Sequence, residues 1–231
     1  MIALFAAEGA EAQALVERLV EPKRIEGPWV AHRGRLAGVE ALVVETGVGK
    51  AAAAAAVGYV AARFAPEGAI WGGVAGALDP ALEPGSVLIA RDAVQWDVDI
   101  TAFGRAPGEL ATGERFVQAD PELTARLEEA ARALGIKVRV GRVASADAFL
   151  ADPARARWVR EAFAADAVEM EGAAALWAAR RLRLPMALVR VVTDGADDSA
   201  PGSFERFLEE ASTRMARLLE ATLRRGVLER V

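Results

Sequence analysis

Short apolar runs alternate with segments of helical periodicity along the chain, and this alternation constrains its fold more than any other feature. The runs expected to form strands are 1–7, 29–36, 39–45, 68–78, 87–96, 137–144, 165–170 and 186–193, of which 68–78 is expected to break into a glycine turn. The segments expected to form helices are 11–20, 51–64, 121–135, 153–163, 172–183 and 204–224. Such an alternation indicates an α/β protein in which helices flank a central mixed β-sheet. Because the 231 residues contain no repeat, low-complexity tract or linker, we expect a single domain over 1–231.

The charge and hydropathy of the chain exclude several classes of partner. The net charge is −5 and no run of Lys or Arg occurs, which argues against nucleic acid or an anionic membrane as the main partner. No apolar run reaches the roughly 20 residues that span a bilayer, and the N-terminus enters a strand-like run without a basic segment. We therefore expect a cytoplasmic protein whose main partner is a small molecule.

The chain contains no Cys, one His and one Tyr, so whole classes of chemistry are absent. A disulfide scaffold, a cysteine nucleophile, a thiolate zinc site and a site with several histidines are excluded. A serine triad would need His32, which lies in an alternating stretch typical of a surface or edge strand. Acid–base chemistry must therefore use Asp or Glu, and we expect no metal and no cofactor.

Six segments directly follow predicted strands and form the candidate site. In open α/β sheets, ligands bind beyond the carboxyl ends of the strands. The segments are AAEGAE (6–11), TGVGK (46–50), GGVAG (72–76), SADAFL (145–150), VEMEG (168–172) and TDGADD (193–198), and we expect GGVAG to be a turn after its strand. The irregular segment 97–116 is long enough to be a functional loop.

The glycine-rich segments do not match the common nucleotide-binding motifs. TGVGK lacks the spacing and the following Ser or Thr of a Walker A loop, and GGVAG fails the GxGxxG pattern of dinucleotide sites. Two interpretations of TGVGK remain open. Its amides hold an anion or a sugar oxygen, or it is a tight turn that closes a βα unit.

Carboxylates are concentrated in VEMEG and TDGADD. A buried carboxylate costs several kcal/mol unless protein donors or a bound molecule satisfy it, so these acids indicate a binding site. Asp194 is the candidate acid, and it needs burial or a nearby like charge to raise its pKa if it is to hold a proton at neutral pH. Glu11 and Glu171 are candidates for that charge, and Arg190 would oppose it.

Two alternatives concern the neighbours of these acids. Asp194, Asp197 and Asp198 suit Mg²⁺ by ligand type, but no phosphate-binding motif accompanies them, so a metal site is less favoured than helix capping by one of the later acids. Glu8 and Glu11 both lie at the start of a helix, where the helix dipole favours a carboxylate, and position alone does not choose between them.

Taken in order, these segments resemble the nucleoside phosphorylase superfamily, and within it the 5′-methylthioadenosine/S-adenosylhomocysteine nucleosidases. The resemblance is carried by Glu11, TGVGK, GVAGAL (73–78), DITAFG (99–104), SADAF (145–149), VEMEGAA (168–174) and VRVVTDGAD (189–197). VEMEGAA followed by TDGAD, with DITAFG upstream, is specific for this group. The resemblance implies a nucleoside phosphorylase-like fold and hydrolysis of the N-glycosidic bond of the two nucleosides, with release of adenine.

The resemblance also implies roles for individual residues. Glu171 would hold the ribose 2′ and 3′ hydroxyls with Met170 packed against the sugar, and Glu169 would be a structural neighbour. Asp194 would donate a proton to purine N7. Glu11 would position and deprotonate the attacking water.

Further implied contacts surround the base and the sugar. Phe149 and Leu150 would stack on adenine and recognise its edge, and Phe204 would close over the base. Val48 and Gly76 would line the sugar and base. Phe103, in DITAFG, would reach into the site of a neighbouring subunit, which implies a homodimer.

Two positions depart from the family pattern. The family commonly has Met near position 8 and Ser near position 74, whereas this chain has Glu8 and Val74 close to the implied sugar and water site.

Three alternative functions remain. A phosphate-dependent phosphorylase of the same fold is disfavoured because AAEGAE lacks the Gly-Asp-Pro-x-Arg phosphate loop. A hydrolase of futalosine or another purine nucleoside, and a non-catalytic nucleoside-binding protein, are the other two.

Overall fold

The computed structural model describes residues 1–226, and the last five residues of the predicted domain, 227–231, lie outside them. Its strands are β1 (Ile2–Ala6), β2 (Val20–Ile25), β3 (Val30–Leu36), β4 (Val39–Glu45), β5 (Gly68–Ala77), β6 (Val87–Gln95), β7 (Val117–Gln118), β8 (Val138–Ser145), β9 (Ala167–Glu169) and β10 (Met186–Asp194). Its helices are α1 (Gly9–Val16), α2 (Lys50–Phe64), α3 (Pro121–Ala133), α4 (Pro153–Phe163), α5 (Gly172–Arg181) and α6 (Ala200–Arg224), with a short 3₁₀ helix at Thr101–Phe103. The predicted α/β class is confirmed.

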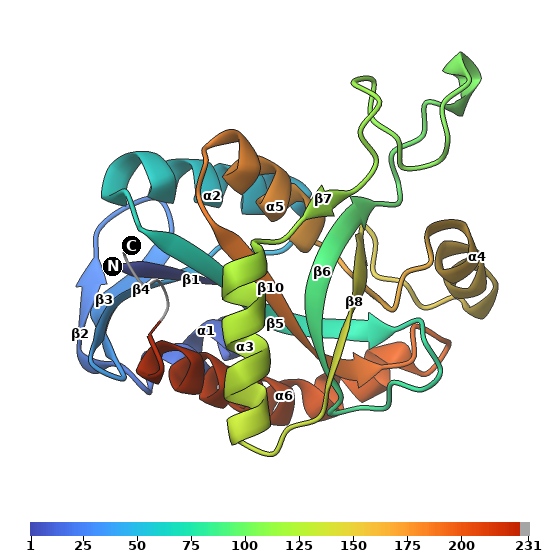
Figure 1. The fold of residues 1–231 in the computed structure, drawn as a ribbon. Coiled ribbons are helices and arrows are strands. Elements are labelled where there is room, and N and C mark those ends of the chain that lie inside the picture. Colours follow the sequence, from blue (N-terminus) through green and yellow to red (C-terminus); the bar gives the residue numbers. More distant parts are fainter. Residues whose placement is uncertain (227–231) are drawn as a thin grey trace.

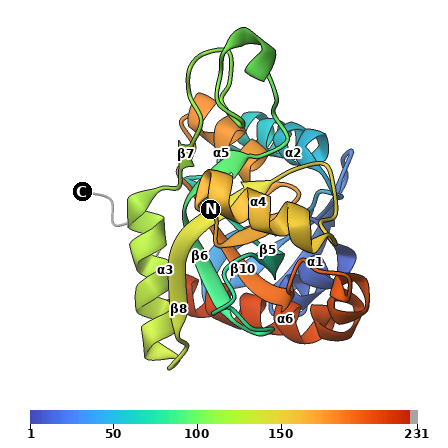
Figure 2. The same ribbon diagram turned by 90° about the vertical axis from the view of Figure 1, so that its right-hand side faces the viewer.

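Helices cover both faces of the sheet because the central strands are apolar on both faces (Figure 1). Along β1, Ala3 and Phe5 join a core that contains side chains of α2 and α5. Leu4 and its neighbours on the opposite face join a second core with side chains of α1, α3 and α6. Since side chains of a strand alternate between faces, a continuous apolar run needs cover on both sides. A third, smaller core lies under α4 (Figure 2).

The sheet closes on one side, which the sequence did not predict. Its order is β10-β6-β8-β9-β5-β1-β4-β3-β2, and β10 also pairs with β5, so that β5, β10, β6, β8 and β9 form a closed ring. The strands β1, β4, β5 and β10 run in one direction, while β6, β8 and β9 run in the other. The carboxyl ends of β8 and β9 therefore point toward the carboxyl ends of β1 and β5.

The predicted turn at GGVAG is wrong, because these residues lie within β5. Glycine occurs here because neighbouring groups come close to the strand. A Cβ atom at Gly72 would lie 2.3 Å from Met215 Sδ, and one at Gly76 would lie 2.7 Å from Asp194 Oδ1. The glycines thus permit close packing and not a change of direction.

Other elements also differ from the prediction. The first helix ends at Val16, and Val20 begins β2, whose sequence VEPKRI is almost fully exposed and has no apolar alternation to reveal it. This edge strand carries charges and a proline, which suit an unpaired edge. The two-residue strand β7 also escaped prediction, and α6 begins at Ala200, four residues before the expected start at 204.

The segment between β6 and β7 projects from the body of the molecule (Figures 1 and 2). It contains the 3₁₀ helix Thr101–Phe103, and Phe103 is 84% exposed. Within the described residues, each helix is too short or too polar to cross a bilayer.

Candidate active site

A pocket brings together all six segments that follow, or were expected to follow, strands. It is lined by Ala7, Glu8, Glu11, Val48, Val74, Ala75, Gly76, Ala148, Phe149, Leu150, Val168, Glu169, Met170, Glu171, Thr193, Asp194 and Phe204. Its empty volume of about 580 Å³, part of it open to solvent, lies within the range of small-molecule sites. Of the predicted site residues, Phe103 alone does not line it.

Strand pairing explains why these segments meet. Ser145, the last residue of β8, pairs with Glu169, the last residue of β9, and Val168 pairs with Gly76 of β5. Across the sheet, β1 ends at Ala6 beside the end of β4. The pocket therefore lies where the carboxyl ends of oppositely directed strands face each other over β5.

Glu11 is the buried acid at the start of α1. Its Oε2 accepts hydrogen bonds from the backbone N–H groups of Ala7, at 3.0 Å, and Glu8, at 2.9 Å, and its Oε1 accepts one from Val74 at 2.8 Å. Burial raises the pKa of Glu11, while the amide donors and the charge of Arg190 oppose the rise. Glu8, in contrast, is only half-buried, so the geometry favours Glu11 as the fixed carboxylate.

Glu171 faces the pocket from the start of α5 and has one hydrogen-bond donor, the backbone N–H of Gly49, at 2.8 Å. Gly49 has a φ of 103°, a conformation that favours glycine. Burial, followed by the charge of Glu169, raises the pKa of Glu171 to about 8. The next amide, that of Lys50, donates to Asp147 at 2.8 Å, so TGVGK is both a βα turn and a donor to the protein's own carboxylates.

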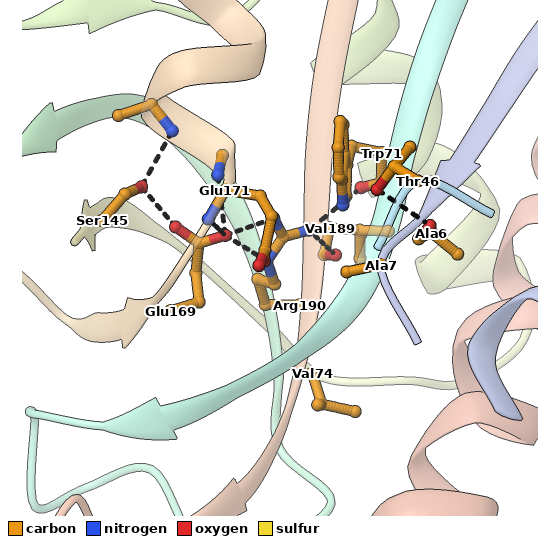
Figure 3. Close-up of polar contacts among 12 residues, drawn as sticks. Ala6, Ala7, Thr46, Trp71, Val74, Ser145, Glu169, Glu171, Val189 and Arg190 are labelled. Atoms are coloured by element: carbon orange, nitrogen blue, oxygen red, sulfur yellow. Dashed lines mark hydrogen bonds and ion pairs between the residues drawn. The ribbon is translucent and has the colours of Figure 1, made fainter. Parts of the chain in front are cut away.

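Glu169 and Arg190 form a buried ion pair behind Glu171 (Figure 3). Arg190 Nη2 lies 2.5 Å from Glu169 Oε2, and its Nη1 donates to the carbonyl of Trp71 at 3.3 Å. Glu169 also accepts hydrogen bonds from the N–H groups of Glu171 and Gly172 and from the Ser145 hydroxyl. These contacts hold the first turn of α5 in place.

Asp194 is the last residue of β10 and lines the pocket. Its Oδ1 accepts a hydrogen bond from the N–H of Ala196, and its Oδ2 accepts one from the Thr193 hydroxyl, both at 2.9 Å. Burial raises the pKa of Asp194, and the charge of Asp197 adds to the rise. The predicted causes of the pKa shift of Asp194 are therefore wrong. Arg190 pairs with Glu169, and neither Glu11 nor Glu171 is a cause of the shift.

Apolar side chains enclose the remaining walls. The rings of Phe149 and Phe204 meet edge to face, with centroids 5.8 Å apart, and Leu150 lines the same pocket. Met170 lies between the two glutamates of VEMEG in the sequence and also lines the wall, as does Val48. A flat apolar ligand fits such walls, and the carboxyl groups supply its polar contacts.

Two residues considered in the sequence analysis, His32 and Asp197, do not line this pocket. His32 lies half-buried in β3, paired with Arg24 of the edge strand and Val43 of β4, and does not line the pocket. Asp197 accepts hydrogen bonds from the N–H and hydroxyl of Ser199, so it stabilises the turn before α6 and is not the helix cap. No group of three or more acidic or histidine side chains within residues 1–226 is arranged to hold a metal ion.

The sequence missed the supporting groups of the site. Arg190 was recognised only as an opponent of Asp194, and Ser145 was not singled out. The available signal was a lone arginine within the otherwise apolar strand MALVRVVT, because a buried arginine needs an acidic partner. Its partner, Glu169, lies at the end of β9, which runs in the opposite direction to β10. The two residues are brought together only by the fold, so the sequence alone does not identify the pair.

Comparisons with known proteins agree with this geometry. Residues 1–224 match the phosphorylase superfamily. The 5′-methylthioadenosine/S-adenosylhomocysteine nucleosidase of Pseudoalteromonas translucida is 33% identical over 225 residues, which are 96% of each chain. The aminodeoxyfutalosine nucleosidase of Campylobacter jejuni is 33% identical over 208 residues, 90% of this chain and 91% of that one.

A solved structure of a relative has a backbone very similar to that of this chain. The 5′-methylthioadenosine/S-adenosylhomocysteine nucleosidase of Neisseria meningitidis, in complex with methylthio-immucillin-A, superposes with a TM-score of 0.93 and 31% identity, covering 97% of this chain and 98% of that chain. The resemblance inferred from VEMEGAA, TDGAD and DITAFG is thus confirmed. The chain belongs to the phosphorylase superfamily, in which these nucleosidases are its relatives.

Proposed function

We propose that this protein is a hydrolase that uses water to release adenine from 5′-methylthioadenosine and S-adenosylhomocysteine. The observation that carries the proposal is a pocket in which Glu11, Glu171 and Asp194 converge beside two aromatic rings, while no described residue of the lining is Lys, Arg or His. The names of the relatives support the same substrates.

The chemistry of the bond explains why carboxyl groups suit it. Cleavage of an N-glycosidic bond builds positive charge on the ribose and negative charge on the leaving purine. Both Glu11 and Glu171 line the pocket, and we propose that they stabilise the positive charge on the sugar. A proton donor at N7 contributes about 1.5 to 3 kcal/mol, or one to two decades in rate, by analogy with charged hydrogen bonds.

Asp194 is the proposed donor to N7. Its raised pKa favours the protonated form that this role requires, and the hydrogen bonds from the Ala196 N–H and the Thr193 hydroxyl fix the orientation of its carboxyl group. Proton transfer by a positioned acid typically adds about 10²- to 10⁴-fold in rate.

Glu11 is the proposed base for the attacking water. Burial raises the pKa of Glu11 above that of an exposed glutamate, which makes its carboxylate a stronger proton acceptor. The three amide donors keep its carboxyl group from rotating, so the position of the water is set by the backbone of α1 and β5.

The remaining proposed contacts bind the substrate. Glu171 holds the ribose hydroxyls, and Met170 packs against the sugar. The pair Phe149 and Phe204 encloses the base, whose edge is recognised at Leu150. Val48 lines the wall beside the sugar, and Gly76 leaves room for Asp194, since a Cβ there would contact its Oδ1.

We further propose a homodimer in which Phe103 enters the neighbouring subunit's pocket. A large aromatic side chain at 84% exposure on a projecting loop marks a surface for an interaction partner. A cytoplasmic location remains part of this proposal.

A second candidate is the hydrolysis of aminodeoxyfutalosine, because the Campylobacter jejuni relative with that name is as similar as the first. A phosphorylase is less favoured, since phosphate needs basic side chains and the described lining of the pocket has none.

One experiment separates these activities. The protein is incubated with 5′-methylthioadenosine, with and without phosphate, and the products are identified by mass spectrometry. We expect adenine and the free thio-sugar at equal rates in both mixtures. A requirement for phosphate with formation of a sugar 1-phosphate would exclude the hydrolase, and binding without adenine release would exclude an enzyme. A parallel kcat/KM comparison with aminodeoxyfutalosine decides between the substrates.

A further inference from the structure

The pocket has an unusual balance of charge. Its described lining contains five carboxyl groups and no basic side chain; the five are Glu8, Glu11, Glu169, Glu171 and Asp194. The nearest buried cation, Arg190, is 1% exposed and already ion-paired with Glu169. The pocket therefore presents acidic groups to a ligand without a compensating cation on its surface.

Glu8 is the acid that the proposed chemistry does not use. Glu11, Glu171 and Asp194 have assigned roles, and Glu169 is held by Arg190, Ser145 and the start of α5. Glu8 is the N-cap residue of α1, lines the pocket and is half-buried, so it faces both the ligand space and solvent. It forms a capping box with Glu11, in which its backbone N–H donates to the Glu11 carboxylate and its side chain accepts from the backbone N–H of Glu11; a neutral glutamine side chain would serve as that acceptor equally well, so the cap requires no charge at position 8.

The charge of this site acts on one part of the substrate. Adenine and ribose are uncharged and common to all adenine nucleosides, whereas the 5′ substituent is neutral, cationic, zwitterionic or anionic. The electrostatic field of the carboxylates in the pocket therefore discriminates between substrates only through the charge of that 5′ substituent.

We propose that Glu8 makes this pocket selective by charge, favouring nucleosides whose 5′ substituent is neutral or cationic over those whose substituent is anionic. This inference rests on the proposed function, because it assumes an adenine nucleoside in the pocket. It assigns a specificity-determining role to the residue that replaces the family's usual methionine.

The expected size follows from Coulomb's law. Two unit charges about 8 Å apart at an effective dielectric constant of about 40 change an equilibrium constant roughly fivefold. Because Glu8 is half-buried, salt screens part of this effect, and selectivity is expected to decrease as ionic strength rises.

The test uses three adenosines of matched length that carry a propylthio, a carboxyethylthio or an aminoethylthio group at the 5′ carbon. We measure kcat/KM for each at low and high salt with the unmodified protein, Glu8→Gln and Glu17→Gln. Glu17 is an exposed acid at the end of the same helix and does not line the pocket, so its variant is the matched control. We also measure equilibrium binding of the three compounds by calorimetry.

We expect the carboxyethylthio compound to be the poorest substrate, and Glu8→Gln to narrow its deficit relative to the propylthio compound about threefold to tenfold, with no change in Glu17→Gln. Equal kcat/KM values for the three compounds, or a deficit that Glu8→Gln leaves intact, would overturn the inference while leaving the hydrolase proposal in place. Absence of turnover with all three would refute the hydrolase instead. In that case equal affinities in the calorimeter would also overturn the charge selectivity.

Discussion

Replacing Glu169 with glutamine tests whether the buried ion pair organises the site. Arg190 is almost fully buried, and its guanidinium contacts Glu169 through Nε at 3.2 Å and Nη2 at 2.5 Å. Glu169→Gln keeps the size of the side chain and one acceptor oxygen for the Gly172 N–H, while its NH2 group would face the Ser145 hydroxyl oxygen, and it removes the charge. The substitution therefore leaves a guanidinium buried without a carboxylate.

The cost is expected to be large. Breaking a buried ion pair by removing one partner costs about 3 to 5 kcal/mol, and the retained acceptor for Gly172 places Glu169→Gln near the lower limit, about 3 kcal/mol. The same substitution in the exposed pair of Glu40 with Arg33, whose side chains are each 46% accessible, should cost less than about 1 kcal/mol.

Urea denaturation monitored by circular dichroism measures both variants. The double variant Glu169→Gln with Arg190→Met removes the buried charge as well, and we expect it to recover more than half of the lost free energy of unfolding. A loss in Glu169→Gln no greater than that in Glu40→Gln would refute the argument, as would a double variant less stable than the single one.

The remaining predictions concern the pocket. Asp194→Asn should lower kcat by at least about 10²-fold while the melting temperature changes little, and near-normal turnover would remove Asp194 from the mechanism. Glu171→Gln should raise KM and lower kcat, whereas a loss of stability alone would contradict a role in sugar binding. Gly76→Ala should impair turnover because its Cβ would lie 2.7 Å from Asp194 Oδ1, while Gly58→Ala in α2, where nothing lies within 4 Å, should not; equal activities would show that Asp194 tolerates displacement. Since the pKa of Glu171 is raised from the usual 4.5 to about 8, the folded protein holds this proton more tightly than the unfolded chain, and the free energy of unfolding should fall as the pH rises from about 4.5 to about 8. Urea midpoints across that range should be flatter in Glu171→Gln, and identical slopes would argue against the raised pKa.

Local patterns predicted most helices and strands. The helix Pro153–Phe163 was predicted at its observed bounds, and in the structure Asp152 caps its N-terminus and a proline occupies its first turn. The apolar run beginning at Met186 predicted β10 to within one residue. Such signals depend on neighbours in the sequence, whereas β2, polar and exposed, has none.

The residues that line the pocket were also largely predictable. Carboxylates that follow buried strands are costly without partners, and Glu171 and Asp194 were singled out on that ground. Position alone did not choose between Glu8 and Glu11. The resemblance favoured Glu11, and the contacts of its carboxylate with the amides of Ala7 and Val74 support that prediction.

The sequence by itself determined the α/β class, the acidic character of the site and the family, since periodicity, composition and motifs are properties of short segments. Only the tertiary structure decided that the sheet closes through β10 and β5, that GGVAG is strand, and that Arg190 pairs with Glu169. These features depend on contacts between residues far apart in the chain. A buried charge needs a partner of opposite charge, and the distance between the strands and their directions decide which residue is close enough. Because Arg190 pairs with Glu169, Glu171 has an amide donor and no arginine partner among the described residues, as the proposed contact with the sugar requires.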